Sequence, residues 1–289
     1  MFNRRRFRCT LKHGVAVFSI LATVALPAIG QASADANAQQ SPTQLTARGE
    51  LNEGVKAYKA ARYEEAITHF ERATELDPGL LTAKTYLATA LAQNVVPGLD
   101  TPENLKTAHR AIAVFEQVLE VSPQDVNSMK QVAGILFSIK NFDDAKVWQK
   151  KVLAEDPGDS AAAYTIGVID WAEAHQNVLI ELKQAGLNDD GEGNVGAPRP
   201  VMVAIKAQNS PLVAEAIEYL VQAVENQPNY DDAMAYLNLV YRRKADLDWD
   251  DEAARRDDLA KAKEWTRKAM ETRKAKEEKN RPQPDSAQP

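Results

Sequence analysis

Cysteine is almost absent from this sequence. Its 289 residues include one cysteine, Cys9, which precedes an apolar run near the N-terminus instead of closing that run as a lipoprotein cysteine would. If the N-terminal segment is removed, the chain keeps no thiol. Disulfides, thiol catalysis and cysteine metal sites are then excluded from the mature protein.

Histidine and the short motifs of catalysis are scarce as well. Three histidines follow the N-terminal segment, His69, His109 and His175, and none belongs to an H-E-x-x-H pair. The sequence also lacks a Gly-x-Ser-x-Gly elbow and a phosphate-binding P-loop. His69 and His109 fall beside large apolar residues in helical segments, where a packed or surface histidine is the ordinary case. We therefore expect a protein that is not an enzyme and binds no cofactor.

The apolar run of residues 15–29 is shorter than the roughly 20 residues that a membrane-spanning helix needs. A basic start precedes it and an A-x-A site ending at Ala34 follows it, which predicts a signal peptide over residues 1–34, cleaved after Ala34. Arg4-Arg5-Arg6-Phe7 partly matches a twin-arginine signal, but Arg8 stands where that signal has an apolar residue, so general secretion is favoured. We expect an exported protein, periplasmic or secreted, with no stable membrane anchor after cleavage.

Positive charge is in short supply once the leader is gone. The full chain has 35 Lys and Arg against 41 Asp and Glu, a formal charge of −6. The leader carries five basic residues and no acidic one, so its removal takes the charge to −11. An acidic protein is poorly suited to phosphate backbones or anionic lipid surfaces. We therefore expect no nucleic-acid partner and look instead to neutral or basic proteins.

What the sequence does contain is a helix pattern that recurs. In residues 63–78, Ala66, Phe70 and Ala73 share one face at helical spacing, and charged side chains share the other. The small residues let another helix approach closely, and Asp77-Pro78 stops the helix. Because one such helix cannot bury its apolar face alone, the chain must supply neighbours.

The ending of this segment recurs three times. Twelve residues before each terminal proline stands an alanine, and four residues after that alanine comes, in most copies, a large apolar residue. The prolines are Pro78, Pro123, Pro157 and Pro228, the alanines are Ala66, Ala111, Ala145 and Ala216, and the following residues are Phe70, Phe115, Gln149 and Leu220. This agreement in phase indicates stacked copies of one helix-turn-helix unit.

The unit resembles the tetratricopeptide repeat, a 34-residue helix-turn-helix with a terminal proline. Gly54 takes the family's glycine position in the first repeat, where Tyr63 is the aromatic residue of the turn, and Gly167 takes the glycine position in the fourth. The sequence lacks the family's aromatic residue at the fourth position of the first helix, and its prolines are 45, 34 and 71 residues apart. The resemblance implies an all-α, right-handed helix-turn-helix solenoid of about five helix pairs.

The remaining composition divides the mature chain into three parts. Residues 35–46 predict a flexible lead-in, residues 47–273 the repeat domain, and residues 274–289 a charged disordered tail. Insertions explain the irregular spacing of the repeats, and they fall at about residues 94–104, 176–209 and 245–256.

The long insertion has its own internal pattern. Its first part, residues 178–186, predicts an extension of the preceding helix, and the Gly- and Asp-rich residues 187–200 predict a flexible loop. Ser210 and Pro211 then predict a new helix, with Ser210 as its N-cap.

Two acidic stretches imitate calcium loops without completing them. Residues 188–194 begin like an EF-hand loop, but its twelfth position is Arg199, where a bidentate acid is required. In the second stretch Asp251 replaces the obligatory glycine, although the acids match the spacing more closely: Asp246, Asp248, Asp250 and Asp257. We expect solvated acidic connections and no metal site.

The resemblance places ligand contacts on the concave face, at five positions of each first helix. Aromatic residues there alternate with cations, which suits an extended or helical peptide of a protein partner. The predicted partner-binding residues are Tyr58, Lys59, Thr85, Thr89, Lys130, Phe137, Tyr164, Trp171, Arg242 and Arg243. The family's carboxylate clamp is not expected, because Gly134 stands where Lys130 would need an asparagine beside it.

We therefore expect an exported scaffold for protein–protein interaction in the cell envelope. Three alternatives stay open. The same aromatic residues could bind glycan or peptidoglycan, the insertion at 176–209 could hold an enzyme site, and the repeats could self-assemble into an envelope structure.

Overall fold

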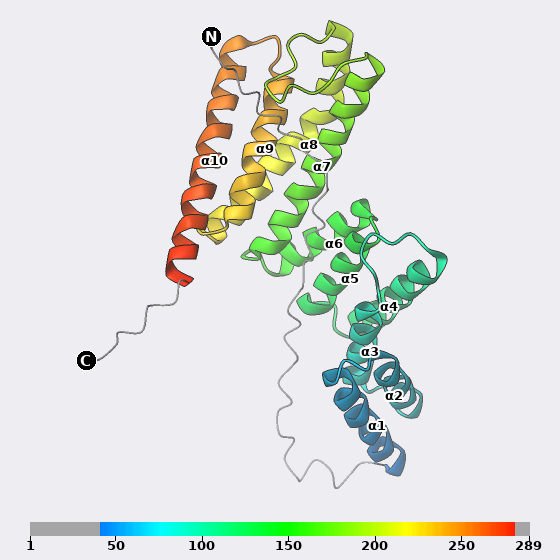
Figure 1. Ribbon diagram of the computed structural model, residues 1–289. Helices are drawn as coiled ribbons and strands as arrows, with labels where there is room; N and C mark the ends of the chain where they lie inside the picture. The colour runs from blue at the N-terminus through cyan, green and yellow to red at the C-terminus, as the bar shows by residue number, and fades with distance from the viewer. Residues whose placement is uncertain (1–40, 281–289) are drawn as a thin grey trace, which may run out of the picture. The chain divides into compact units, whose positions relative to one another are not determined.

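The computed structural model describes residues 41–280, and this part of the chain forms ten α-helices (Figure 1). The helices are α1 (Pro42–Lys59), α2 (Tyr63–Leu76), α3 (Leu81–Gln93), α4 (Pro102–Val121), α5 (Val126–Ser138), α6 (Phe142–Glu155), α7 (Ser160–Gln184), α8 (Arg199–Asn226), α9 (Asp231–Leu247) and α10 (Glu252–Asn280). They follow one another as five pairs, which confirms the predicted all-α repeat architecture. The predicted leader with its cleavage site at Ala34 lies outside the described residues. Within residues 41–280, no helix combines the length and apolar character that a membrane span requires.

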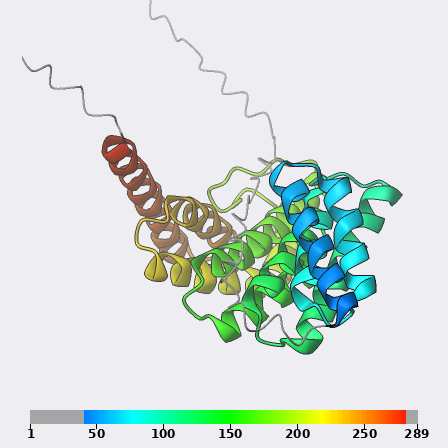
Figure 2. The ribbon, with the colours of Figure 1, turned by 90° about the horizontal axis from the view of Figure 1, so that it is seen from below.

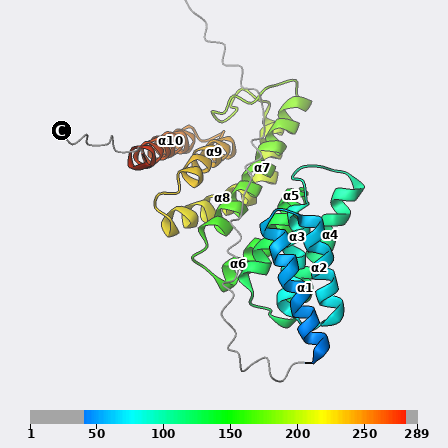
Figure 3. The ribbon, with the colours of Figure 1, turned by 60° about the horizontal axis from the view of Figure 1, so that its bottom comes forward.

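The described chain divides into two compact units. Unit 1 holds the described residues up to Ala111 and residues 138–140, and unit 2 holds residues 112–137 and those from Asn141 onward. In unit 1, α1 packs on α2 and α2 on α3, so the blue and cyan helices lie side by side (Figure 2). In unit 2, α7 packs on α8, α8 on α9, and α9 on α10, in the order seen in Figure 3.

Each terminal proline occupies the second position of the same β-turn. The amide two residues after the proline donates to the carbonyl of the residue before it, and proline suits this position because its φ is already set. The four hydrogen bonds are Leu80 to Asp77 (3.0 Å), Asp125 to Ser122 (3.1 Å), Asp159 to Asp156 (3.1 Å) and Tyr230 to Gln227 (2.9 Å). The recurring sequence ending is therefore a recurring turn that returns the chain to the next pair.

The turn inside a pair repeats as well. Ala61 and Lys140 have φ of 57° and 62°, and the amide after each reaches back to a helix carbonyl five residues earlier. A residue in the left-handed conformation, followed by an amide that donates to a carbonyl five residues earlier, is a common helix ending. Tyr63 in the first pair and Phe142 in the third then open the second helix.

The two predicted family glycines lie where two helices touch. A Cβ atom on Gly54 would lie 2.5 Å from Cε1 of Phe70, and one on Gly167 would lie 2.5 Å from Cγ of Leu220. Both distances are far below van der Waals contact, so each glycine permits an approach that any side chain would prevent. Phe70 and Leu220 are themselves fully buried.

Two helix boundaries differ from the sequence prediction. Helix α1 begins inside the predicted lead-in because Ser41 and Gln44 cap it: the Gln44 amide donates to Ser41 Oγ (3.2 Å) and the Ser41 amide to Gln44 Oε1 (3.0 Å). Helix α10 continues to Asn280, through the first part of the predicted disordered tail. Arg273 and Lys276 hold this part to α9 by ion pairs with Asp231.

The predicted helix start at Ser210 and Pro211 is wrong, because α8 runs unbroken through both residues. Met202 and Ile205 of its first half are fully buried in the core of unit 2. Asn209 is also fully buried, and its Nδ2 donates to the Ala174 carbonyl of α7 (2.8 Å). This burial outweighs the one backbone hydrogen bond that a proline cannot donate.

Replacing Gly167 by alanine tests the close approach of α7 and α8. Because the new Cβ would also lie 3.1 Å from the Ala216 carbonyl oxygen, we expect the free energy of unfolding to fall by about 1–3 kcal/mol. Gly134→Ala in α5 is the matched control, since nothing lies within 4 Å of its new Cβ. Helix propensity should then raise stability by roughly 0.5–1 kcal/mol. Urea denaturation measures both changes, and equal effects would contradict the packing argument.

Candidate functional site

Aromatic residues of the predicted face gather between two first helices of unit 2. Tyr164 and Trp171 project from α7, and Tyr236 of α9 meets both nearly at right angles, with ring centroids 5.6 Å and 5.2 Å away. Tyr230, which caps α9, lies 5.0 Å from Tyr164. We call Tyr230, Tyr164, Tyr236 and Trp171 the aromatic row. Two edge-to-face contacts of Tyr236 and one tilted contact of Tyr230 hold the four rings together.

The aromatic row is half-buried and uncharged. Burial, together with the nearby carboxylate of Asp232, raises the pKa of Tyr230 to about 12. The same causes raise the pKa values of Tyr164 and Tyr236 above the usual value for tyrosine. Their hydroxyl groups therefore stay protonated and can donate or accept hydrogen bonds at the edge of an apolar surface.

His175 connects the aromatic row with the loop between α7 and α8. Its ring stacks on Trp171 with centroids 5.3 Å apart and planes 9° apart. Its Nδ1 lies 4.0 Å from a carboxylate oxygen of Asp189, which belongs to the loop of residues 185–198. This loop joins α7 to α8 at the upper end of unit 2 in the view of Figure 1.

A buried guanidinium holds the loop to α9. Arg243 is 3% exposed, and its Nη2 donates to both carboxylate oxygens of Asp189 (2.9 and 3.1 Å). Its Nη1 lies 3.1 Å from the fully buried Asp246. Asn194 completes the cluster by donating to Asp246 (2.8 Å) and to Asp189 (3.0 Å). We call Asp189, Asn194, Arg243 and Asp246 the buried latch.

The loop backbone is held at two further points. Arg242 Nη1 donates to the Gly191 carbonyl (2.9 Å), and Arg255 Nη1 donates to the Glu192 carbonyl (3.1 Å). Gly193 has φ of +104°, and a Cβ there would lie 2.5 Å from Arg255 Cδ. The stretch that the sequence predicted to be a flexible loop is therefore a hydrogen-bonded structure with a required glycine.

The expectation of solvated acidic connections is wrong for Asp246, which is buried against Arg243. Asp248 and Asp258 share Lys244, at 2.7 and 2.8 Å from its Nζ. In the described part of the chain, no three His, Cys, Asp or Glu side chains come together as metal ligands could. These carboxylates are occupied by cations of the same chain.

A second charged cluster joins α6, α7 and α8. Lys146 Nζ lies 2.6 Å from the buried Asp170 and 2.7 Å from Glu215, which also binds Lys150. Burial raises the pKa of Asp170 to about 6. The cluster ties second helix α6 of the third pair to both helices of the fourth pair, α7 and α8.

Three of the predicted partner-binding cations bind other groups of the same chain. Arg242 and Arg243 bind the insertion loop, and Lys130 of α5 forms an ion pair with the buried Asp159 at the start of α7. Arg243 in particular is buried, so the prediction that it contacts a partner is wrong. Phe137 is half-buried and meets the ring of Phe142 edge-on (5.3 Å).

Four predicted residues belong to unit 1. Tyr58 is half-buried against Tyr63 (5.4 Å between centroids), and Lys59 is exposed. Thr85 is half-buried, while Thr89 is buried and donates its hydroxyl to the Thr85 carbonyl (2.7 Å), which closes it to a ligand. Unit 1 therefore presents fewer aromatic rings on its first helices than unit 2 does.

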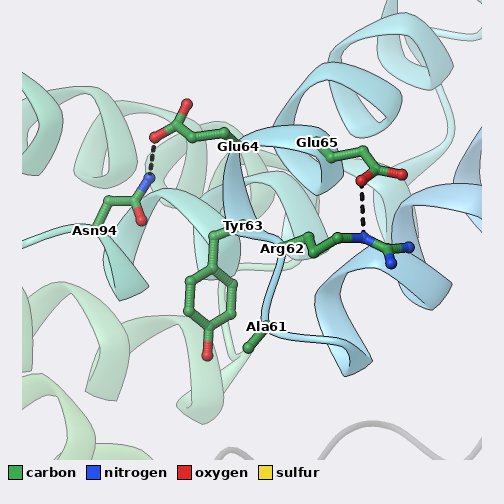
Figure 4. A pocket seen from close by; sticks show the side chains of 6 residues that line it. All are labelled: Ala61, Arg62, Tyr63, Glu64, Glu65 and Asn94. Atoms are coloured by element: carbon green, nitrogen blue, oxygen red, sulfur yellow. Dashed lines mark hydrogen bonds and ion pairs between the residues drawn. The ribbon is translucent and has the colours of Figure 1, made fainter.

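A shallow depression of unit 1 lies beside the turn between α1 and α2 (Figure 4). Its volume is 460 Å³, and it is lined by Ala61, Arg62, Tyr63, Glu64, Glu65 and Asn94. Asn94 donates to Glu64 (2.7 Å), and Arg62 pairs with Glu65 (2.8 Å), as the dashed lines show. Four of its six lining residues thus pair with one another, and the aromatic row is the stronger candidate.

Sequence reasoning missed Tyr230, Tyr236, His175 and the latch residue Asp189. Tyr236 stands at the sixth position of first helix α9. This position faces the preceding first helix, α7, and it is not one of the five positions at which the family resemblance places ligand contacts. An aromatic residue there, opposite Tyr164 and Trp171, was the available signal. The latch had no local signal, because Asp189 and Arg243 are 54 residues apart.

Removing the latch guanidinium should destabilise unit 2 and release the loop. Arg243→Gln leaves the buried Asp246 and the half-buried Asp189 without their cation, so we expect the free energy of unfolding to fall by about 3–5 kcal/mol. Arg242→Gln is the control, because half-buried Arg242 donates only to neutral oxygens and its loss should cost about 1 kcal/mol. Urea denaturation and amide exchange of residues 185–198 measure the effects. Equal losses would contradict the buried ion-pair assignment.

Raising the pH should also weaken the latch. Burial raises the pKa of Asp246 from 3.8 to about 7, so the folded chain holds a proton that the unfolded chain has released. The free energy of unfolding should therefore fall as the pH rises from about 4 to about 7, by up to about 1.4 kcal/mol per pH unit for this group. Asp246→Asn stays neutral and should flatten that slope in urea denaturation at pH 5, 6, 7 and 8. A slope that is unchanged in the variant would contradict the assignment.

Comparison with known proteins identifies the repeat. The family model described as "Tetratricopeptide repeat" matches residues 57–80, from the end of α1 through α2 to the turn that follows. No curated protein matches the sequence significantly.

Solved structures share the fold along most of the chain. "MamA 41-end from Desulfovibrio magneticus RS-1" is 18% identical with a TM-score of 0.53, covering 81% of this chain and 97% of that one. "MamA RS-1 ArsTM double mutant" is 18% identical with a TM-score of 0.54 (82% and 98% covered). "Crystal structure of MamA protein" is 13% identical with a TM-score of 0.54 (83% and 98% covered). One helix pair therefore matches the tetratricopeptide repeat by sequence, and these solved structures share the fold of stacked helix pairs along most of the chain.

Proposed function

We propose that the protein is an exported scaffold that binds a segment of another protein on the first-helix face of unit 2, meaning the surface of α5, α7 and α9 that carries the aromatic row. The observation that supports this most is the row itself. It places four half-buried rings from two neighbouring repeats side by side. Half-buried tyrosine and tryptophan side chains are typical of the residues that dominate binding energy in protein interfaces.

The binding mechanism follows from how the row is built. Each ring is held by another ring or by the helix packing beneath it, so little side-chain freedom is lost when a partner binds. Apolar side chains of the partner would cover the rings, and the tyrosine hydroxyls would hydrogen-bond with its polar groups. Unit 2 supplies the support, because α6 packs on α7, α7 on α8 and α8 on α9.

The ring geometry favours a peptide over a glycan. Sugar rings stack on aromatic faces that are open and flat. One face of Trp171 is covered by His175, and Tyr236 meets both of its neighbours edge to face. A protein segment with irregular apolar side chains fits such a corrugated surface better.

Site-specific photo-crosslinking in cells tests the proposed face. A photoreactive phenylalanine at position 236 should capture a partner protein, whereas the same residue at Tyr219, on second helix α8, should not. Once a partner is known, Trp171→Ala should weaken binding by at least about 2 kcal/mol, roughly 30-fold. Tyr219→Ala should leave it unchanged. Capture at position 219 alone would contradict the proposal.

Export is tested separately. The protein expressed with its leader should be recovered from the periplasmic fraction or the medium, with Asp35 as its first residue. Full-length protein that stays in the cytoplasm would contradict export and leave the binding face to be tested on its own.

A further inference from the structure

The cations of the first-helix face of unit 2 are already bound within the chain. Lys130 pairs with Asp159, Arg242 donates to the Gly191 carbonyl, and Arg243 lies in the buried latch. On the loop side, Arg255 of α10 donates to the Glu192 carbonyl. A partner that approaches the aromatic row therefore meets few cationic donors that are not already bound within the chain.

Carboxylates flank the same row. Asp190 and Glu192 are exposed on either side of Gly191, whose carbonyl Arg242 binds. Within residues 41–280, neither carboxylate has a cation partner. Asp190 Oδ1 accepts only the amides of Glu192 (2.7 Å) and Asn194 (2.9 Å). The loop thus presents two exposed carboxylates without an ion-pair partner at the end of the row where Trp171 and His175 lie.

The other end of the row carries a carboxylate as well. Asp232 lies close enough to Tyr164, Tyr230 and Tyr236 to raise the pKa of each. Its carboxylate side chain is 39% exposed and lies 3.3 Å from Nη2 of Arg273, whose Nε pairs with Asp231 at 2.9 Å. Aromatic rings between two acidic ends form a surface that attracts cations, because ring faces carry negative potential as well.

We propose that the partner segment is basic, with lysine or arginine side chains beside apolar residues that cover the aromatic row. Burial of apolar side chains on the row would supply most of the affinity. The lysine and arginine side chains of the partner would pair with Asp190 and Glu192 at one end and with Asp232 at the other, and these pairs would set the specificity and the direction in which the segment binds. A second copy of this chain fits poorly, because its formal charge is −6. The inference rests on the proposed function and names the chemistry of its ligand.

The test is a selection from a displayed random-peptide library on residues 35–289, with every amino acid equally represented. We expect the selected peptides to be enriched in Lys and Arg next to aromatic or aliphatic residues. Their affinity should then be measured on Asp190→Asn/Glu192→Gln, a variant that removes both charges and keeps the Asp190 acceptor oxygen. Binding should weaken roughly ten-fold at low salt, and the difference should shrink as salt rises.

The matched control is Glu218→Gln/Glu225→Gln, which removes the same charge from exposed positions of second helix α8. Its affinity for the selected peptides should equal that of the unchanged chain. Amide exchange of residues 185–198 should be the same in all three proteins, which separates a charge effect from a loosened loop.

Each other outcome contradicts a specific part of the proposal. Acidic or uncharged selected peptides whose binding is lost in Trp171→Ala would overturn the basic ligand and keep the binding face. Basic peptides that bind the Asp190/Glu192 variant and the control equally well would overturn the role of the loop carboxylates. If no peptide is enriched, or if binding ignores Trp171→Ala, both the inference and the proposed face fail.

Discussion

The distance between neighbouring helices governs everything else in this protein. An amphipathic helix pair cannot bury its apolar face alone, and it buries that face fully only where small residues let the backbones approach. Ala66, Ala111, Ala145 and Ala216, one from each recurring segment, have no exposed surface. Gly54 and Gly167 bring the first helices just as close to Phe70 and Leu220. Within each unit these contacts make the packing rigid, and this rigidity allows side chains on neighbouring first helices to act as one surface.

The aromatic row depends on that rigidity. Tyr236 meets Tyr164 and Trp171 only because α9 lies directly against α7, and this arrangement is set by α8, which packs between their other faces. Asn209 contributes by holding α8 to α7 through the Ala174 carbonyl, even though Pro211 interrupts the backbone hydrogen bonds two residues later. The position of a surface ring is thus decided by polar and apolar contacts in the interior.

The insertion loop changes the charge that the surface presents. By residue type, the end of α9 looks cationic, since it contains Arg242 and Arg243. In the fold, Arg243 is buried between Asp189 and Asp246, and the half-buried Arg242 binds a loop carbonyl, so both cations are bound within the chain. The acids left outside, Asp190 and Glu192, then set the character of that end. A buried guanidinium is retained at such a site because removing it would strand the carboxylates it pairs with.

The sequence by itself determined the class of fold, the five helix pairs, the turns and the glycine contacts. These features rest on local rules: helical periodicity, a proline with preset φ, and small residues where a neighbour must approach. The capping box at Ser41 and Gln44 was readable by the same rules, although the predicted lead-in overlooked it. Only the tertiary structure decided that α8 passes through Pro211, that Asp189 meets Arg243, and that Tyr236 completes the aromatic row. Each of these depends on contacts between residues far apart in the chain, where burial outweighs local preference and no pattern of spacing reveals which side chains meet.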